Sequence, residues 1–248
     1  MTLVGAAAAA PPTDLAANLR EGSDKNARAL LLSFALHSWS ELYGFPLDAI
    51  ANRTNQGIIH RLAQNNCVSL EKKPRLGTIL GIVTVARATK NKDIATIEPF
   101  GSFARANSVD PARVQGPLLI AQGDRDTIVA PAVTRTFARS ACRNRTKIRW
   151  VEMRGTEHGT SAKDSVAETL AWIGARFAGE APPDDCRARS SASVEYAGID
   201  RSLAGQPRNR VGAEQADYRG DRERGGKQCP EQPHSAQAVG IEERGDRR

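Results

Sequence analysis

The segment Pro117–Gly159 restricts the fold of this 248-residue chain more than any other part of it. An apolar run, Pro117–Ala121, leads into a loop that carries Asp126, and a helical pattern follows. A second strand-like run, Lys147–Met153, leads into a loop that carries His158. Parallel strands joined through a helix deliver their carboxyl ends to one edge of a sheet. The order therefore predicts an α/β fold in which an acid and a base meet at that edge.

The residues around these two loops resemble a known family. Gly123–Val129 matches the motif G-x-x-D-x-[IV]-V, and His158–Gly159 supplies an H-G pair after the second strand. Five further segments carry the same resemblance: VGAAAAAPPTDLAANL, HSWSELYG, NNC, AWIGARFAG and PPDDC. Together they resemble the C-terminal part of the α/β-hydrolase fold of secretory lipases, over roughly residues 2 to 186.

The resemblance implies a partial α/β-hydrolase fold with four parts. We expect a core strand in residues 1–12, a mainly helical cap insertion in 13–105 and the C-terminal part of the hydrolase core in 106–186. Residues 187–248 are rich in Arg, Gly, Ser, Gln and acids with only single apolar residues, so we expect a disordered basic tail.

The resemblance also assigns roles to the loop residues. It implies that Asp126 is the acid of a catalytic triad and that His158 is its base. Asp124 is the competing acid, and its place in the motif favours a role in holding the turn. Glu157 is expected to be solvated. A triad further requires a serine on a sharp strand-to-helix turn, written G-x-S-x-G.

The sequence contains no G-x-S-x-G motif. Ser102 and Ser161 are the nearest substitutes, but neither follows a strand and precedes a helix as the turn requires, and Ser161 is expected to cap a helix together with Asp164. The resemblance thus implies the C-terminal portion of a lipase or carboxylesterase that hydrolyses triacylglycerol or other esters in lipid catabolism. It implies no metal or organic cofactor, and this chain alone is expected to be inactive. The alternative is a non-catalytic interaction protein or relic that uses the helical region, with the basic tail as a weak anion-binding arm.

The four cysteines carry no CxxC pair and no metal-binding spacing, so we expect no zinc site among them. The resemblance implies a disulfide between Cys142 and Cys186, and two buried thiols are the alternative. It also implies that Cys67 lacks its partner in this chain. Cys229 lies in the basic tail.

The net charge of +7 and pI near 9.5 would suit a nucleic acid partner. The arginines are scattered among acids without stacking aromatics, so we expect a solvated surface and no specific nucleic acid binding. No signal peptide is readable at Met1, and the apolar segment 29–36 is too short to span a bilayer. The resemblance implies a lipid or ester substrate, contact of the cap with a lipid interface and an extracellular location; it leaves the oligomeric state open.

The local patterns predict individual elements. Thr2–Ala10 reads as a strand buried on both faces, and Asp24–Tyr43 as a helix. Leu47–Cys67 repeats the helical pattern, whereas Leu76–Ala86 fits a strand or a buried helix equally well. Asn91–Val114 is polar and turn-rich, and we expect it to run along the surface.

Two further expectations concern the helical region. The inner face of the helix over 24–43 is predicted to contain Ala27, Leu30, Leu31, Phe34, Ala35, Trp39 and Leu42. His37 and His60 have no partner motif, so both are expected to be packing or surface histidines.

Overall fold

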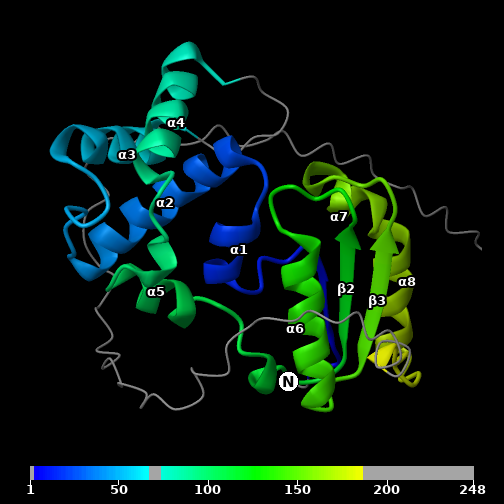
Figure 1. Cartoon of the computed structure of the whole chain (residues 1–248). Helices are drawn as coiled ribbons and strands as arrows, with labels where there is room; N and C mark the ends of the chain where they lie inside the picture. Colours follow the sequence, from blue (N-terminus) through cyan, green and yellow to red (C-terminus); the bar gives the residue numbers. More distant parts are fainter. Residues whose placement is uncertain (1–2, 67–73, 187–248) are drawn as a thin grey trace, which may run out of the picture.

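A computed structural model describes residues 3–66 and 74–186 of the chain (Figure 1). The expected disordered tail of 187–248, with Cys229, lies outside the described residues, and so does Cys67. In Figure 1 a group of helices, mostly in blue and cyan, lies beside a parallel sheet in which β2 and β3 are green. The helices and the sheet have separate apolar clusters.

The sheet consists of parallel strands β1 (Ala6–Ala9), β2 (Leu118–Gly123) and β3 (Ile148–Met153), in the order β1-β2-β3. Every residue of β2 is buried, because this strand has a neighbour on each side and helices on both faces. β1 is only half-buried, so the expectation of a strand buried on both faces is wrong. Within the described residues β1 is an edge strand. The parallel sheet with flanking helices confirms the predicted partial α/β fold.

Alternate residues of β2 pack against different helices, as the two-residue period of a strand requires. Leu118 and Ile120 face α6 (Pro131–Arg143) on one side of the sheet. Leu119 and Ala121 face Trp172 of α8 (Val166–Phe177) on the other side. α6 and α8 therefore cover opposite faces of the sheet (Figure 1). Because both faces of the central strand β2 are covered by helices, β2 needs apolar residues at successive positions and so is a continuous apolar run in the sequence.

A disulfide between Cys142 and Cys186 joins the end of α6 to the last described residues. The two Cα atoms are 5.6 Å apart, and both cysteines pack against the cluster around Ile120 and Trp150. The same segment is held along β3, where the amide of Asp185 donates to the carbonyl of Ile148 at 2.8 Å. The bond closes a loop of 44 residues. The structure thus contains the disulfide that the family resemblance implied.

The helical region contains α1 (Leu15–Glu21), α2 (Lys25–Tyr43), α3 (Arg53–Asn65), α4 (Leu76–Thr89) and α5 (Phe100–Ala106). Side-chain oxygens of Asp14, Asp24 and Asn52 accept backbone N–H groups at the starts of α1, α2 and α3. The ambiguous segment over 76–86 is helical, because its apolar face completes the cluster formed by α2 and α3. No helix in the described part of the chain is long and apolar enough to cross a membrane.

Three sequence expectations for this region are wrong. The buried residues of α2 are Ala29, Leu32, Ser33, Leu36 and Trp39, so the inner face is rotated from the predicted one. α3 begins at Arg53, and the preceding residues form a turn that buries Leu47 and Ile50. The segment 91–114 contributes to the core through α5, whose Phe100 is fully buried.

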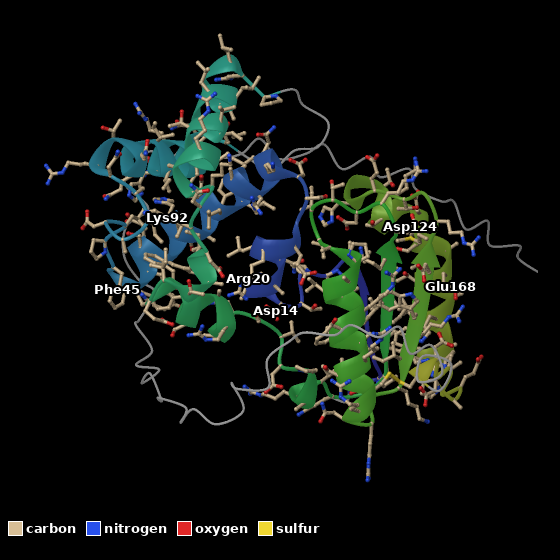
Figure 2. The ribbon with its side chains drawn as sticks, viewed as in Figure 1. Asp14, Arg20, Phe45, Lys92, Asp124 and Glu168 are labelled. Carbon is tan, nitrogen blue, oxygen red and sulfur yellow. A yellow bond between two sulfur atoms is a disulfide. The ribbon has the colours of Figure 1, made fainter. Side chains whose placement is uncertain are left out.

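The turn before α3 is held from outside by a lysine. The ammonium group of Lys92 donates to the carbonyls of Ala49 and Ile50, at 3.0 and 2.8 Å. Figure 2 shows Lys92 and Phe45 within the helical region, with Arg20 on α1. Arg20 forms an exposed ion pair with Asp93, which contributes little to stability because water screens it.

The boundaries of a separate cap at 13–105 stay a prediction.

The disulfide predicts a measurable loss of stability when it is removed. The double variant Cys142→Ser/Cys186→Ser should lose about 2–5 kcal/mol of unfolding free energy, since the unfolded chain regains the freedom of the closed loop. Urea denaturation measures this loss. Dithiothreitol should destabilise the wild type to the same extent and leave the double variant unchanged. An equal response of both proteins to the reductant would contradict the prediction.

Candidate active site

Two loops meet where β2 and β3 end. The parallel register pairs Gly123 with Met153, so the residues that follow the two strands emerge at the same edge of the sheet. Asp126 lies in the loop after β2, and His158 begins a short 3-10 helix, η3 (His158–Thr160), after β3. Figure 2 labels Asp124 at this edge, beside the arrowheads of the two strands.

The Asp126 carboxylate and the His158 imidazole form a hydrogen bond of 2.8 Å between Oδ2 and Nδ1. The Asp126 side chain is completely buried, whereas the imidazole is 29% exposed. An ionised carboxylate can only accept, so Nδ1 of His158 donates the proton. The neutral imidazole then carries its lone pair on Nε2, which is the nitrogen available to a reacting group.

Backbone and side-chain donors hold the buried carboxylate. Oδ1 of Asp126 accepts the N–H groups of Ile128 and Val129 at 2.9 and 2.8 Å, and Oδ2 also accepts from Nε2 of Gln122 at 3.2 Å. Burial on its own raises the pKa of the Asp126 carboxyl. The hydrogen bonds from His158, Val129 and Ile128 outweigh it, so the pKa lies below its ordinary value. The group is therefore an anion at neutral pH.

Sequence reasoning missed Gln122. Its side chain is buried at the end of β2, where its amide donates to Oδ2 of Asp126 and also to the carbonyls of Gly123 and Val129. A polar residue inside an otherwise apolar strand is a usable signal, because a buried amide needs hydrogen-bond partners. Gln122 thus ties the loop that carries Asp126 to the strand below it.

Asp124 performs a different task from Asp126. Its Oδ1 accepts the N–H of Gly155 at 2.7 Å, and its own N–H donates to the carbonyl of Met153. These bonds tie the loop after β2 to the loop after β3, which confirms that Asp124 holds the turn. Glu157 is exposed, as expected for a solvated residue.

Gly123 allows the two loops to approach closely. A Cβ atom built on Gly123 would lie 2.2 Å from the carbonyl oxygen of Thr156, well inside contact distance. That same carbonyl accepts the N–H of Arg125. The absence of a side chain at this position therefore brings the histidine loop against the carboxylate loop.

The expected capping role of Ser161 is wrong. Its buried hydroxyl donates back to the carbonyl of Glu157, and Asp164 instead accepts from the hydroxyls of Thr156 and Thr160. The expected single helix is divided into α7 (Ser161–Asp164) and α8, which begins at Val166. The Ser161 hydroxyl is thus engaged with the backbone.

Ser102 lies on α5 in the helical region, where its hydroxyl accepts from Arg105. His37 and His60, expected as packing or surface histidines, lie against each other, with their Nδ1 atoms 2.8 Å apart. None of these three residues belongs to the Asp126–His158 pair.

Comparison with known proteins agrees with the motifs. The family model described as Secretory lipase matches residues 1–185. The chain belongs to the secretory lipase family. The family model covers both residues of the pair at the sheet edge, Asp126 and His158.

Solved structures show a similar fold. Lipase A of Candida antarctica is 18% identical, with a TM-score of 0.54, over 73% of this chain and 43% of that lipase. A putative dipeptidyl aminopeptidase IV from Bacteroides ovatus is 17% identical, with a TM-score of 0.28, over 39% of this chain and 14% of that protein. A search of curated proteins gives no match. The secretory lipase chain thus spans less than half the length of lipase A, and that likeness shows a partial α/β-hydrolase fold.

The pKa of Asp126 predicts an acid-dependent stability. Because the pKa is lower in the folded state, its ionisation stabilises the fold fully above about pH 4, near the unfolded value. That contribution is lost as the pH falls through the folded value. Asp126→Asn should lower the unfolding free energy by about 1–3 kcal/mol at pH 7 and by progressively less as the pH falls below about 4. Urea denaturation of the wild type and the variant across this pH range measures the difference in their unfolding free energies. A difference that does not shrink in acid would contradict the prediction.

The close approach at Gly123 predicts a steric cost. Gly123→Ala places a methyl group against a backbone carbonyl, so the strand or the histidine loop must shift, at about 1–3 kcal/mol of unfolding free energy. Gly174→Ala is the matched control, because nothing lies within 4 Å of its Cβ position on α8. The control should gain about 0.5–1 kcal/mol from helix propensity. Equal effects of the two variants in urea denaturation would be evidence against the steric argument.

Proposed function

We propose that Asp126 and His158 are the acid and base of the catalytic triad of a lipase-type ester hydrolase. The observation that carries the proposal is the 2.8 Å hydrogen bond between a buried carboxylate and a partly exposed imidazole. Both residues occupy the edge of a parallel sheet where α/β enzymes hold their ligands. They also lie within the residues that the family model matches.

The geometry suits general base catalysis. Nε2 of His158 would take the proton of a serine hydroxyl as that oxygen attacks the ester carbonyl, and would later return it to the leaving alcohol. The Asp126 carboxylate keeps the proton on Nδ1 and stabilises the imidazolium that forms. The donors of Ile128, Val129 and Gln122 fix the carboxylate and so orient the ring.

The attacking serine, in this proposal, comes from a segment outside these 248 residues. The sequence has no G-x-S-x-G motif, and the hydroxyl of Ser161 is bonded to the backbone. The similar lipase A is more than twice as long as the part that this chain spans. The substrate would be a triacylglycerol or another carboxylic ester, hydrolysed outside the cell in lipid catabolism, with the helices at 13–105 contacting the lipid interface.

The chain as it stands should not react with a fluorophosphonate probe, because that probe labels an activated serine. Incubation of the purified 248-residue protein with the probe, followed by mass spectrometry, measures this. An intact serine esterase treated in parallel is the control. Stoichiometric labelling of Ser161, or of any other serine, would overturn the assignment of the nucleophile to another segment.

In a longer polypeptide that supplies a G-x-S-x-G serine, ester hydrolysis should depend on both loop residues. His158→Ala should lower kcat by several thousandfold or more, because the serine loses its base. Asp126→Asn should lower kcat by several thousandfold and up to roughly ten-thousandfold, because the imidazole loses its correct tautomer. Ser102→Ala, on the exposed side of α5, should leave kcat unchanged. Hydrolysis of p-nitrophenyl esters measures the three rates. Near wild-type rates in the His158 or Asp126 variant would refute the proposed roles.

A further inference from the structure

The helical region holds a second cluster of chemically active side chains, remote from the Asp126–His158 pair in the sequence. His37 and Glu41 lie on α2, and His60 lies on α3. The nearest ligand atoms of the three residues all lie within 4.8 Å of one another. We propose that His37, Glu41 and His60 form a binding site for a divalent transition metal ion of the zinc class.

The positions of these residues follow from helix geometry. His37 and Glu41 are four residues apart on α2, so both side chains project from one face of that helix, one turn apart. His60 is brought opposite them because α2 and α3 pack through Leu36, Ile59 and other members of one apolar cluster. The three side chains are therefore placed by buried neighbours, and two of them are themselves half-buried.

The two imidazoles present their nitrogens to each other. The Nδ1 atoms of His37 and His60 are 2.8 Å apart, and the ring planes are inclined by 84°. In the hydrogen bond one nitrogen donates the proton and the other accepts it. A zinc ion bound at about 2.0–2.1 Å by each nitrogen would separate them by about 3.3 Å in a tetrahedral site. Binding an ion between them thus requires the donor ring to carry its proton on Nε2 and the two Nδ1 atoms to separate by about half an ångström.

Glu41 completes a set of two imidazoles and one carboxylate. Its carboxylate is exposed and can turn toward the two nitrogens, and it supplies the negative charge that favours a cation. Two nitrogens and one oxygen suit zinc or a neighbouring transition metal, whereas magnesium and calcium prefer oxygen ligands alone. The exposure of Glu41 leaves room for water as a fourth ligand.

The surroundings of the His37 imidazole disfavour its protonated form. Burial, and then the neighbouring His60, lower the pKa of the His37 imidazole; Glu41 opposes them, and the pKa lies below its ordinary value.

A bound ion would tie α2 to α3. These helices are also linked through the apolar cluster, so the site would stiffen the helical region and leave the sheet unaffected. The family resemblance implies no metal cofactor, and the cysteines lack the spacing of a zinc site. No local motif indicates the histidine ligands, since they lie 23 residues apart on two different helices.

The test is calorimetric titration of the full chain with ZnCl2, after EDTA treatment and alkylation of free thiols with the Cys142–Cys186 disulfide intact. The wild type should bind one ion per chain at this site, and MgCl2 should give no comparable heat. His37→Gln and His60→Gln should each weaken zinc binding by at least about a hundredfold, the upper end of what loss of an outer-shell partner costs. His158→Gln and His234→Gln remove the other two histidines of the sequence and should change the affinity less than about twofold.

Glu41→Gln keeps the test decisive if a histidine variant fails to fold. Glu41 is exposed, so the variant should retain the far-UV circular dichroism of the wild type while binding zinc at least about tenfold more weakly. Cobalt(II) gives a second readout, since a four-coordinate site absorbs strongly in the visible range and the variants should lose that absorption. The absence of one-to-one binding in the wild type, or an unchanged affinity in Glu41→Gln and the folded histidine variants, would overturn the proposal. Neither result depends on the hydrolase proposal, because both concern His37, Glu41 and His60, which lie outside the Asp126–His158 pair.

Discussion

The candidate active site depends on the parallel pairing of β2 with β3. This register places the loop of Asp126 and the loop of His158 at one edge of the sheet, and Gly123 lets the loops close to contact distance. Asp124 then joins them through the N–H of Gly155. Only with this support can the buried carboxylate accept two backbone N–H groups, a glutamine amide and the imidazole at once. The hydrogen-bonded pair of Asp126 and His158 thus depends on the backbone geometry of the two loops.

The helical region and the sheet are stabilised by different means. The helices surround one apolar cluster that extends from Ala29 to Ala104, and local side chains cap the starts of α1, α2 and α3. The sheet is covered on each face by one main helix, and the disulfide holds the last described residues against β3. Each region also has one hydrogen-bonded pair that includes a histidine. Asp126 and His158 pair at the edge of the sheet, and His37 and His60 pair between two packed helices. Each region therefore contains its own preorganised pair.

The sequence predicted the elements that have a strong local signal. The apolar run of β2 and the loop acids after it appear where their chemistry placed them. It failed where apolar residues surround a helix on all sides, as in α2, because periodicity then selects no unique face. It also failed at Ser161, where several hydroxyls and one carboxylate compete for partners within a single turn. Gln122 was missed because an apolar pattern gives no weight to a single polar residue at its end.

By itself the sequence determined the family, the parallel α/β class of the core and the loop positions of Asp126 and His158, because short motifs and strand-length apolar runs are local properties. The tertiary structure alone decided which helix faces are buried, that β1 is half-buried and that 76–86 is helical. It also decided that His37, Glu41 and His60 come together. These features arise from packing between segments far apart in the chain, and the free energy of such packing is not encoded in any one segment.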